Sequence, residues 1–305
     1  MDLSRSLLAS RRRLGTELRS LREAAGKKIE DAADVLECSS AKISRLENGK
    51  GVPRTRDVRD LVALYGNDAH EKLTELLELA VDGQGQDWWS DFRDVTQGEM
   101  FAGHLFQYVA LEQDASTIKS FEADLIPGLL QTEEYIDAVC SLVFPEQSQR
   151  ERARFVDFRK KRQAVVWGAA KPPEFGIILS EAALIRPIGG AGVMRRQLEE
   201  LRTGLQGKLS KVDFRVTPLS APAPGALGGP FSIIKFADDS DQGVVYLEGR
   251  VGATYLESDA DVRRFEQIFS SLERDSLDRD ESIKRLTAEI ESLDAPNLAA
   301  TSAVS

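Results

Sequence analysis

One short segment near the N-terminus, residues 39–50, constrains this chain most. Ser39 or Ser40 can cap the start of a helix there, because a serine oxygen accepts a hydrogen bond from a free first-turn amide. Ile43 and Leu46 form an apolar edge, and Gly49 ends the helix. A helix whose outer residues are small or basic suits the major groove of DNA, which is about 12 Å wide.

The residues before this segment predict two more helices and a tight turn. Leu14, Leu18 and Leu21 recur at helical spacing in residues 14–25. Residues 29–36 form a second short helix, and Glu37-Cys38 leads into the helix of residues 39–50. A fourth helix follows over residues 58–65. This order is typical of a helix-turn-helix, in which the second helix of the motif enters the groove.

The letters "LRSLREAAGKKIEDAADVLECS", followed by "SSAKISRLENGKGVP", resemble the lambda-repressor-like (Xre-type) DNA-binding domain over roughly residues 10–66. The resemblance implies a structural salt bridge between Arg22 and Glu47, and base reading by Ser40, Ala41 and Arg45. The DNA-binding residues that we expect are Lys28, Ser39, Ser40, Ala41, Lys42, Ser44, Arg45, Asn48 and Lys50.

Three departures from the family pattern matter. The recognition positions Ser40 and Ala41 are small, so we expect Arg45 to carry much of the direct readout. The usual turn glycine is Glu37, and a non-glycine residue in a left-handed turn costs roughly 1–2 kcal/mol. The usual glutamine that opens the second helix is Ile29, which removes one phosphate contact. A plain helical bundle is the alternative interpretation of these helices. Arg11-Arg12-Arg13 either reaches the DNA backbone or is a solvated helix start.

The charge of the chain divides unevenly. The 305 residues carry a net charge of −10, yet residues 1–66 hold 14 Lys and Arg against 10 Asp and Glu, or +4. The remainder holds 26 and 40, or −14. A basic head on an acidic body favours DNA contact by the head alone, because phosphate repels the body.

The small numbers of cysteines and histidines and the lack of a long apolar segment argue against a disulfide-rich, metal-binding or membrane-spanning protein. Cys38 and Cys140 form no disulfide framework, and with two histidines we expect neither a metal site nor a cofactor. We see no signal peptide and no apolar window of ~18 residues, so we expect a cytoplasmic protein outside the membrane.

The rest of the chain predicts a second domain. We expect the head at residues 1–81 with a final helix over 70–81, a hinge at 82–87, the second domain at 88–293 and a disordered tail at 294–305. Within the second domain we expect strands at residues 117–125, 174–179, 212–217, 231–236, 243–247 and 252–256. Expected helices cover residues 100–114, 133–142, 147–167, 180–186, 193–205, 261–277 and 279–293. The fold class is therefore multi-domain: an all-α helix-turn-helix head followed by an α+β domain with a largely antiparallel sheet.

This second half resembles another family. The segments "FEADLIPGLLQTEEYIDAV", "ILSEAALIRPIGGAGVMRRQLEELR" and "PFSIIKFADDSDQGVVYLEG" together resemble the C-terminal domain of the Scr-type, antitoxin-like transcriptional regulators. The resemblance runs from about residue 88 to residue 286. It implies a small partner protein.

Three acids in apolar segments, Glu122, Glu181 and Glu248, could in principle perform acid–base chemistry. Arg159, Arg162 and Arg186 are possible counter-charges. We favour internal salt bridges that fix strands to the long helix, and expect no enzyme. A small-molecule effector stays open.

One apolar stripe is a candidate interface. Ile283, Leu286, Ile290 and Leu293 have the spacing of a coiled-coil seam, which either folds back on its own chain or pairs two chains. We therefore expect a sequence-specific, DNA-binding transcriptional regulator that binds an operator as a homodimer. The alternative is an antitoxin-like protein that binds a small partner protein, with DNA binding for autoregulation.

Overall fold

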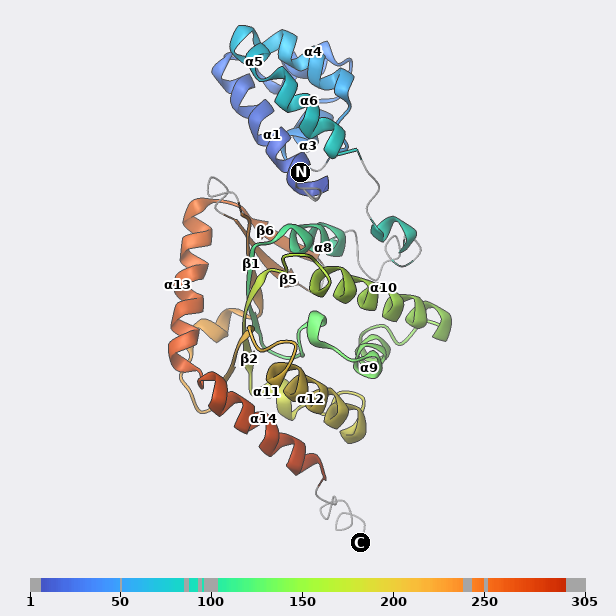
Figure 1. Cartoon of the computed structure of the whole chain (residues 1–305), viewed down its shortest axis with the longest axis vertical. Coiled ribbons are helices and arrows are strands. Elements are labelled where there is room, and N and C mark those ends of the chain that lie inside the picture. Colours follow the sequence, from blue (N-terminus) through green and yellow to red (C-terminus); the bar gives the residue numbers. More distant parts are fainter. Residues whose placement is uncertain are drawn as a thin grey trace. The chain divides into compact units, whose positions relative to one another are not determined.

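The chain forms two compact units, Met1–Asp91 and Phe92–Ser305 (Figure 1). A computed structural model describes residues 7–49, 51–84, 88–92, 95, 104–237, 243–249 and 252–294. Half of the expected hinge lies outside this range, because only Asp82, Gly83 and Gln84 of residues 82–87 are described. The expected disordered tail also lies outside it, apart from Asp294.

The first unit is helical. Its helices are α1 (Leu7–Ala24), α2 (Ile29–Val35), α3 (Ser40–Glu47), α4 (Thr55–Tyr65), α5 (Asn67–Glu71) and α6 (Leu73–Asp82), followed by the short η1 (Trp88–Phe92). The single helix predicted over residues 70–81 is therefore two helices. They meet at Lys72, whose ammonium group binds Glu17 of α1 at 2.6 Å.

The apolar residues that predicted these helices form one core. Leu14 and Leu18 of α1, Ile43 of α3 and Leu61 of α4 are almost fully buried together. Leu76, Leu79 and Ala80 of α6 close the core. Because each helix buries only one stripe, the opposite faces stay free for solvent or a ligand.

The second unit combines a sheet with helices. Its strands are β1 (Thr117–Glu122), β2 (Glu174–Ser180), β3 (Asp213–Thr217), β4 (Phe231–Lys235), β5 (Val244–Gly249) and β6 (Gly252–Leu256). Its helices are α8 (His104–Asp114), η2 (Gly128–Leu130), α9 (Glu133–Val143), α10 (Gln149–Trp167), α11 (Ala182–Ile185), α12 (Ala191–Gln206), η3 (Pro224–Gly228), α13 (Asp259–Asp275) and α14 (Arg279–Asp294). The predicted fold class, an all-α head followed by an α+β domain, is confirmed.

The six strands form one mixed sheet in the order β3-β2-β1-β4-β5-β6. The pairs β1–β4, β4–β5 and β5–β6 are antiparallel, whereas β1–β2 and β2–β3 are parallel. Parallel neighbours need a crossover connection. Here α9 and α10 connect β1 to β2, and α11 and α12 connect β2 to β3.

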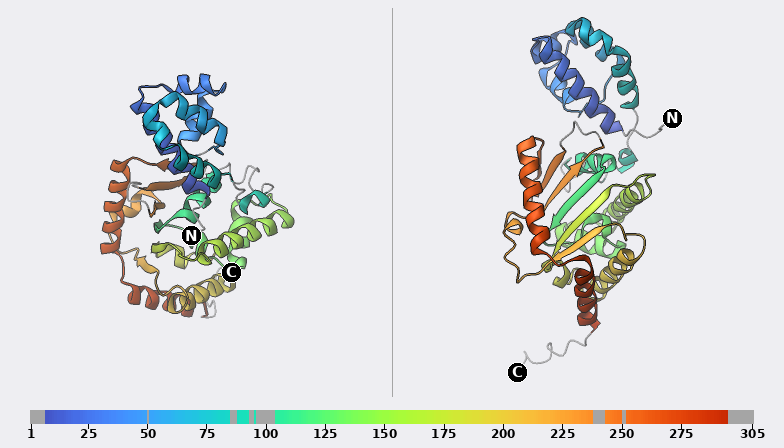
Figure 2. Two further views of the ribbon diagram at one scale, coloured as in Figure 1. Left: turned by 45° about the horizontal axis from the view of Figure 1, so that its top comes forward. Right: turned by 60° about the vertical axis from the view of Figure 1, so that its left-hand side comes forward.

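Helices cover both faces of the sheet (Figure 2). On one face, α13 packs Val262, Phe269 and Leu272 against Phe121 and Phe231 of the strands. The other face carries α8 to α12 (Figure 1). Glu122, next to Phe121 in β1, points to this second face because successive side chains of a strand alternate.

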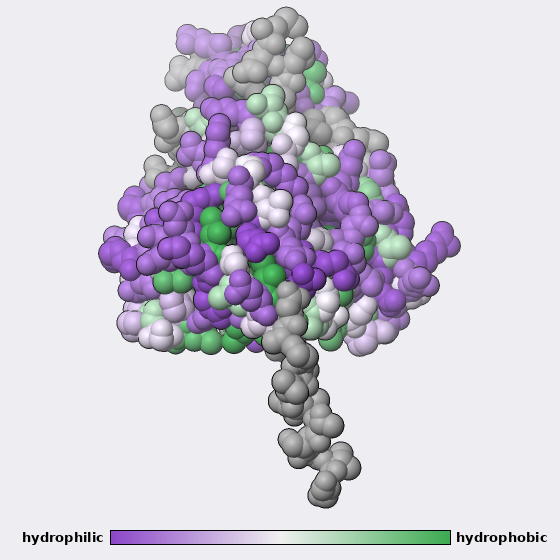
Figure 3. Space-filling view, turned by 60° about the horizontal axis from the view of Figure 1, so that its bottom comes forward, coloured by the Kyte–Doolittle hydropathy of each residue, from purple (hydrophilic) through white to green (hydrophobic). Residues whose placement is uncertain are grey.

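The apolar stripe of α14 folds back onto its own unit. Leu286 and Ile290 are 0% and 4% exposed, and α14 packs on α12 and β3. Ile283 and Leu293 are half-buried at the edge of this contact. The interpretation of these four residues as a dimer interface is therefore wrong at its two central positions, because a side chain buried in its own unit cannot also meet a second chain. The visible face over α11, α12 and α14 is mostly hydrophilic (Figure 3).

The start of α14 also covers the outer edge of the sheet. The backbone N–H of Val216 in β3 donates to the hydroxyl of Ser282 at 2.9 Å, and the carbonyl of Val216 accepts from the N–H of Leu277 at 2.9 Å. An open strand edge is a template for pairing with another chain. This edge is occupied here by the chain's own loop and helix.

Candidate nucleic-acid interface

The turn between α2 and α3 sets the direction of α3. Glu37 has φ +48°, so the residue stands in the left-handed region that the sequence predicted for this turn. The N–H of Glu37 donates to the carbonyl of Asp34, and the N–H of Cys38 donates to that of Ala33. This pair of hydrogen bonds is the Schellman ending of a helix, which commonly has glycine at the position that Glu37 occupies.

Arg22 and Glu47, the pair implied by the first resemblance, lie together between α1 and α3. Nε and Nη2 of Arg22 donate to the two carboxylate oxygens of Glu47 at 2.7 and 3.0 Å. Both side chains are buried, and the hydrogen bonds to Glu47 raise the pKa of Arg22. Loss of one partner would leave an uncompensated buried charge, which costs about 3–5 kcal/mol.

Gly15 brings α1 and α3 into close contact, and sequence reasoning missed it. A Cβ atom at Gly15 would lie 2.5 Å from the carbonyl oxygen of Glu47 and 2.6 Å from that of Leu46. Only glycine therefore allows the two backbones to pack at this distance. The available signal was a glycine inside a helical pattern, which usually has a packing reason.

The surface of α3 that faces away from the core carries the expected reading residues. Ser40, Ala41 and Arg45 are exposed, and Ser44 is half-buried beside them. Ser39 holds the N-cap position with extended backbone, but its side chain makes no capping hydrogen bond, and neither does that of Ser40. The predicted capping bond is therefore absent, which leaves both hydroxyls free for a ligand.

The other expected contact residues differ in how free they are. Lys28 is exposed at the start of α2. The ammonium group of Lys42 lies 2.8 Å from the carboxylate of Asp57 in α4. The amide of Asn48 donates to the carbonyl of Ser44 at 2.8 Å, so it closes the end of α3. Lys50 lies outside the described residues.

The acids of the second unit pair differently from the expectation. Arg162 of the long helix α10 binds Glu112 of α8 through two hydrogen bonds of 2.5 and 2.7 Å, and both side chains are buried. Glu181 accepts from Arg285 of α14 at 2.6 Å and from the N–H of Leu219. The predicted salt bridges from strands to the long helix are therefore wrong: these pairs connect helices or loops.

The charges of Glu122, Glu248 and Arg159 influence one another. Glu122 is partly buried, and burial together with Glu248 raises its pKa to about 8. Glu248 is exposed on β5. Burial and Arg162 lower the pKa of Arg159 to about 10, and its guanidinium lies 3.5 Å from the side-chain oxygen of Gln131. Arg186 pairs with Asp124 at 3.1 Å near the surface.

Comparison with protein families identifies both units. Residues 13–74, from α1 to α6, match a family described as a helix-turn-helix domain. Residues 105–288, from α8 to α14, match the family described as a domain of unknown function, DUF5753. The chain belongs to the DUF5753 family. Comparisons with curated proteins and with solved structures gave no match.

The DUF5753 match covers the whole mixed sheet and its helices, so the second unit is the DUF5753 domain. Among the described residues, no three His, Cys, Asp or Glu side chains gather as they would around a metal ion. No helix in the described part of the chain has the length and apolar character needed to cross a membrane.

Proposed function

We propose that this helix-turn-helix regulator reads a specific operator through the exposed face of α3. The helix-turn-helix domain makes the protein a DNA-binding regulator. The observation that carries the finer proposal is the division of α3 into two faces. Ile43, Leu46 and Glu47 are buried in the unit, whereas Ser40, Ala41 and Arg45 are exposed together.

Arg45 carries the main base contact in this proposal. The guanidinium group can donate two hydrogen bonds to a guanine edge, and one such pair provides about 1–3 kcal/mol of discrimination. Ser40 and Ala41 are small, so they let α3 approach the base edges. Lys28, Ser39, Ser44 and Lys50 would contact phosphates, which fix position without reading sequence.

The first prediction tests this assignment. The operator is selected from random duplexes with the full-length protein, and binding of Arg45→Ala is then measured on operator and on random DNA. We expect a loss on the operator of about 1–3 kcal/mol and a smaller loss on random DNA. Arg19→Ala is the matched control, because Arg19 is an exposed arginine that pairs within α1. Equal losses on both kinds of DNA would contradict the base-reading role.

The regulator acts as a dimer in this proposal. A single short recognition helix reads one half-site, and such proteins usually bind two half-sites about 34 Å apart. Since the centre of the α14 stripe is buried, the two-fold contact must come from another surface. Sedimentation on duplexes with one or two half-sites tests this. One chain on the two-site duplex would contradict it.

The DUF5753 domain, in this proposal, binds a partner protein or an effector and performs no catalysis. The resemblance to antitoxin-like regulators supports a small partner protein. The engagement of Glu181 by Arg285 and Leu219 supports a structural role for one of the three candidate acids. Native mass spectrometry of the protein purified from its own cells would detect a bound small protein or metabolite. A mass equal to that of the chain alone would contradict the proposal that the DUF5753 domain binds a partner protein or an effector.

A further inference from the structure

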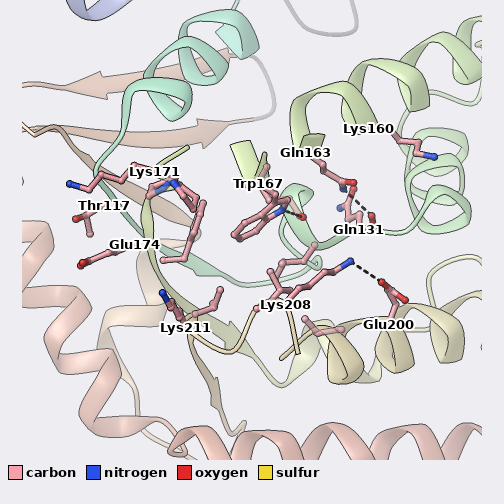
Figure 4. A pocket seen from close by; sticks show the side chains of 18 of the residues that line it. Thr117, Gln131, Lys160, Gln163, Trp167, Lys171, Glu174, Glu200, Lys208 and Lys211 are labelled. Atoms are coloured by element: carbon pink, nitrogen blue, oxygen red, sulfur yellow. Dashed lines mark hydrogen bonds and ion pairs between the residues drawn. The ribbon is translucent and has the colours of Figure 1, made fainter. Parts of the chain in front are cut away.

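A pocket of about 1070 Å³ lies within the DUF5753 domain (Figure 4). The ends of α10 and α12, the turn η2 and the first residues of β1 and β2 surround it. None of these elements belongs to the DNA-binding unit. The volume is that of a site for a small organic molecule, since such pockets commonly measure about 300–1,000 Å³.

The wall of this pocket combines apolar and polar side chains, and hydrogen bonds hold it in place around Trp167. The indole N–H of Trp167 donates to the carbonyl of Leu129 at 3.1 Å, and its ring packs on Phe175 at 4.7 Å between centroids. The amide of Gln163 donates to the carbonyls of Gly128 and Gln131 at 2.8 and 2.9 Å. The bond to Leu129 orients the Trp167 ring, and the bonds from Gln163 hold the turn that contains Leu129. The half-buried ring of Trp167 thus offers a preformed surface for an apolar body.

The rim of the pocket is rich in lysine. Residues 92–305 contain eight lysines, and four of them line the pocket: Lys160, Lys171, Lys208 and Lys211. Lys160 pairs with Glu133, and Lys208 pairs with Glu200 at 3.3 Å. Within the described part of the chain, Lys171 and Lys211 form no salt bridge. They lie with Glu174 at one end of the pocket, on the far side of Trp167 from Lys160 (Figure 4).

The net charge of the pocket lining indicates the charge of the ligand that the pocket would attract. The lining holds four lysines and three glutamates, which leaves a net charge of +1 in a chain whose net charge is −10. A local positive potential in an acidic protein attracts an anion. The ammonium group of lysine is a point charge on a flexible chain, whereas the guanidinium group of arginine is planar and rigid. Lysine can therefore contact one anionic group on organic molecules of different shapes.

We propose that this pocket binds a small organic anion, with its apolar body against Trp167 and its carboxylate at Lys171 and Lys211. Four lysines on the rim of one preformed pocket, beside the fixed ring of Trp167, are the observation that carries this inference. This proposal rests on the proposed function, in which the DUF5753 domain binds an effector, and it gives the chemical class of that effector. The test below uses no DNA, so the two proposals can fail separately.

The test uses two probes with the same body. 2-Naphthoate carries the anion, and 2-naphthamide is its neutral counterpart. The full-length chain has three tryptophans and therefore three indole N–H signals in an ¹⁵N spectrum. The variants Trp88→Phe and Trp89→Phe assign two of them, and the third belongs to Trp167. We expect naphthoate to shift the Trp167 signal in a saturable way, and naphthamide to bind at least about fivefold more weakly, because the charge contact is lost.

Matched lysine variants complete the test. Lys171→Gln combined with Lys211→Gln should weaken naphthoate binding about five- to tenfold. Lys161→Gln combined with Lys284→Gln removes the same charge from exposed lysines outside the pocket and should leave the affinity unchanged. Equal affinity for the two probes, no shift of the Trp167 signal, or equal losses in both double variants would each overturn the proposal.

Discussion

At the scale of single residues, Glu37 and Glu122 occupy states that residues of their type usually avoid. Glu37 has a left-handed backbone in the turn before α3, at φ +48°. Glu122 is partly buried on a strand, where burial and Glu248 raise its pKa to about 8, against the weaker opposing effect of Arg162 and Arg159. Both states have an energetic cost that one substitution can remove.

The strain at Glu37 predicts that glycine stabilises the turn. Glu37→Gly removes the Cβ clash of the left-handed region, and we expect a gain of about 1 kcal/mol in the stability of the first unit. Hydrogen exchange of the α2 and α3 amides in the full chain measures it. Glu37→Ala removes the same carboxylate but keeps Cβ, so it should give no gain. A gain of equal size in both variants would assign the effect to charge instead.

The raised pKa of Glu122 predicts a pH-dependent stability. Between pH 4.5 and 8 the folded state holds a proton on Glu122 that the unfolded chain releases, so stability should fall as pH rises through this range and level off above pH 8. Each unit of pKa difference corresponds to about 1.4 kcal/mol.

Glu122→Gln removes this titration. The free energy of unfolding of the variant should therefore increase relative to that of the native protein as pH rises from 6 to 8. Urea denaturation, followed through the indole signal of Trp167, measures the difference. Parallel pH profiles for the two proteins would show that Glu122 ionises normally.

At the scale of elements, the contact between α1 and α3 fixes where the reading helix stands. Alanine in place of glycine inside a helix normally adds about 0.8–1 kcal/mol of stability. At Gly15, alanine should lower the stability of the protein instead of raising it. The new Cβ would meet backbone oxygens at 2.5 and 2.6 Å, and backbone cannot rotate away as a side chain can.

We therefore expect Gly15→Ala to lower the melting temperature, by a loss of about 1–3 kcal/mol, and to weaken operator binding through a displaced α3. Differential scanning calorimetry and a binding titration measure the two effects. Thr16→Ala, at the exposed neighbouring position, is the control and should change neither. A more stable Gly15→Ala protein would show that the two helices separate at no cost.

At the scale of the whole molecule, charge placement favours DNA binding by the first unit. The helix-turn-helix region carries +4 over residues 1–66, while the rest of the chain carries −14. Within the head, Lys42, one of the expected DNA contacts, is already paired with an acid. Asp57, only 14% exposed, holds the ammonium group of Lys42.

Asp57→Asn should therefore strengthen binding to any duplex several-fold, because it frees Lys42 and removes a negative charge near α3. The slope of log affinity against log salt should steepen by about one. Asp60→Asn, on the same helix but paired loosely with Arg56 at 3.6 Å, is the matched control. Equal effects of the two substitutions would mean that only the net charge of the head matters.

The sequence by itself determined the elements of this protein. Apolar residues at a period of 3.6 located most of the described helices, because this period follows from local backbone geometry. Short apolar runs, only partly alternating, located the six strands. The exposed face of α3 was also predictable, since Ile43 and Leu46 assign the opposite face to the core.

Tertiary structure decided what each element meets. The spacing of the α14 stripe is compatible with a seam between two chains and with packing on its own core. Only the tertiary structure shows that Leu286 is buried in its own unit. Arg162 paired with Glu112 rather than with a strand acid, because partners distant in sequence depend on how α8 and α10 pack. Gly15 and the lysine-lined pocket likewise depend on distances between segments, which no periodicity in a single sequence encodes.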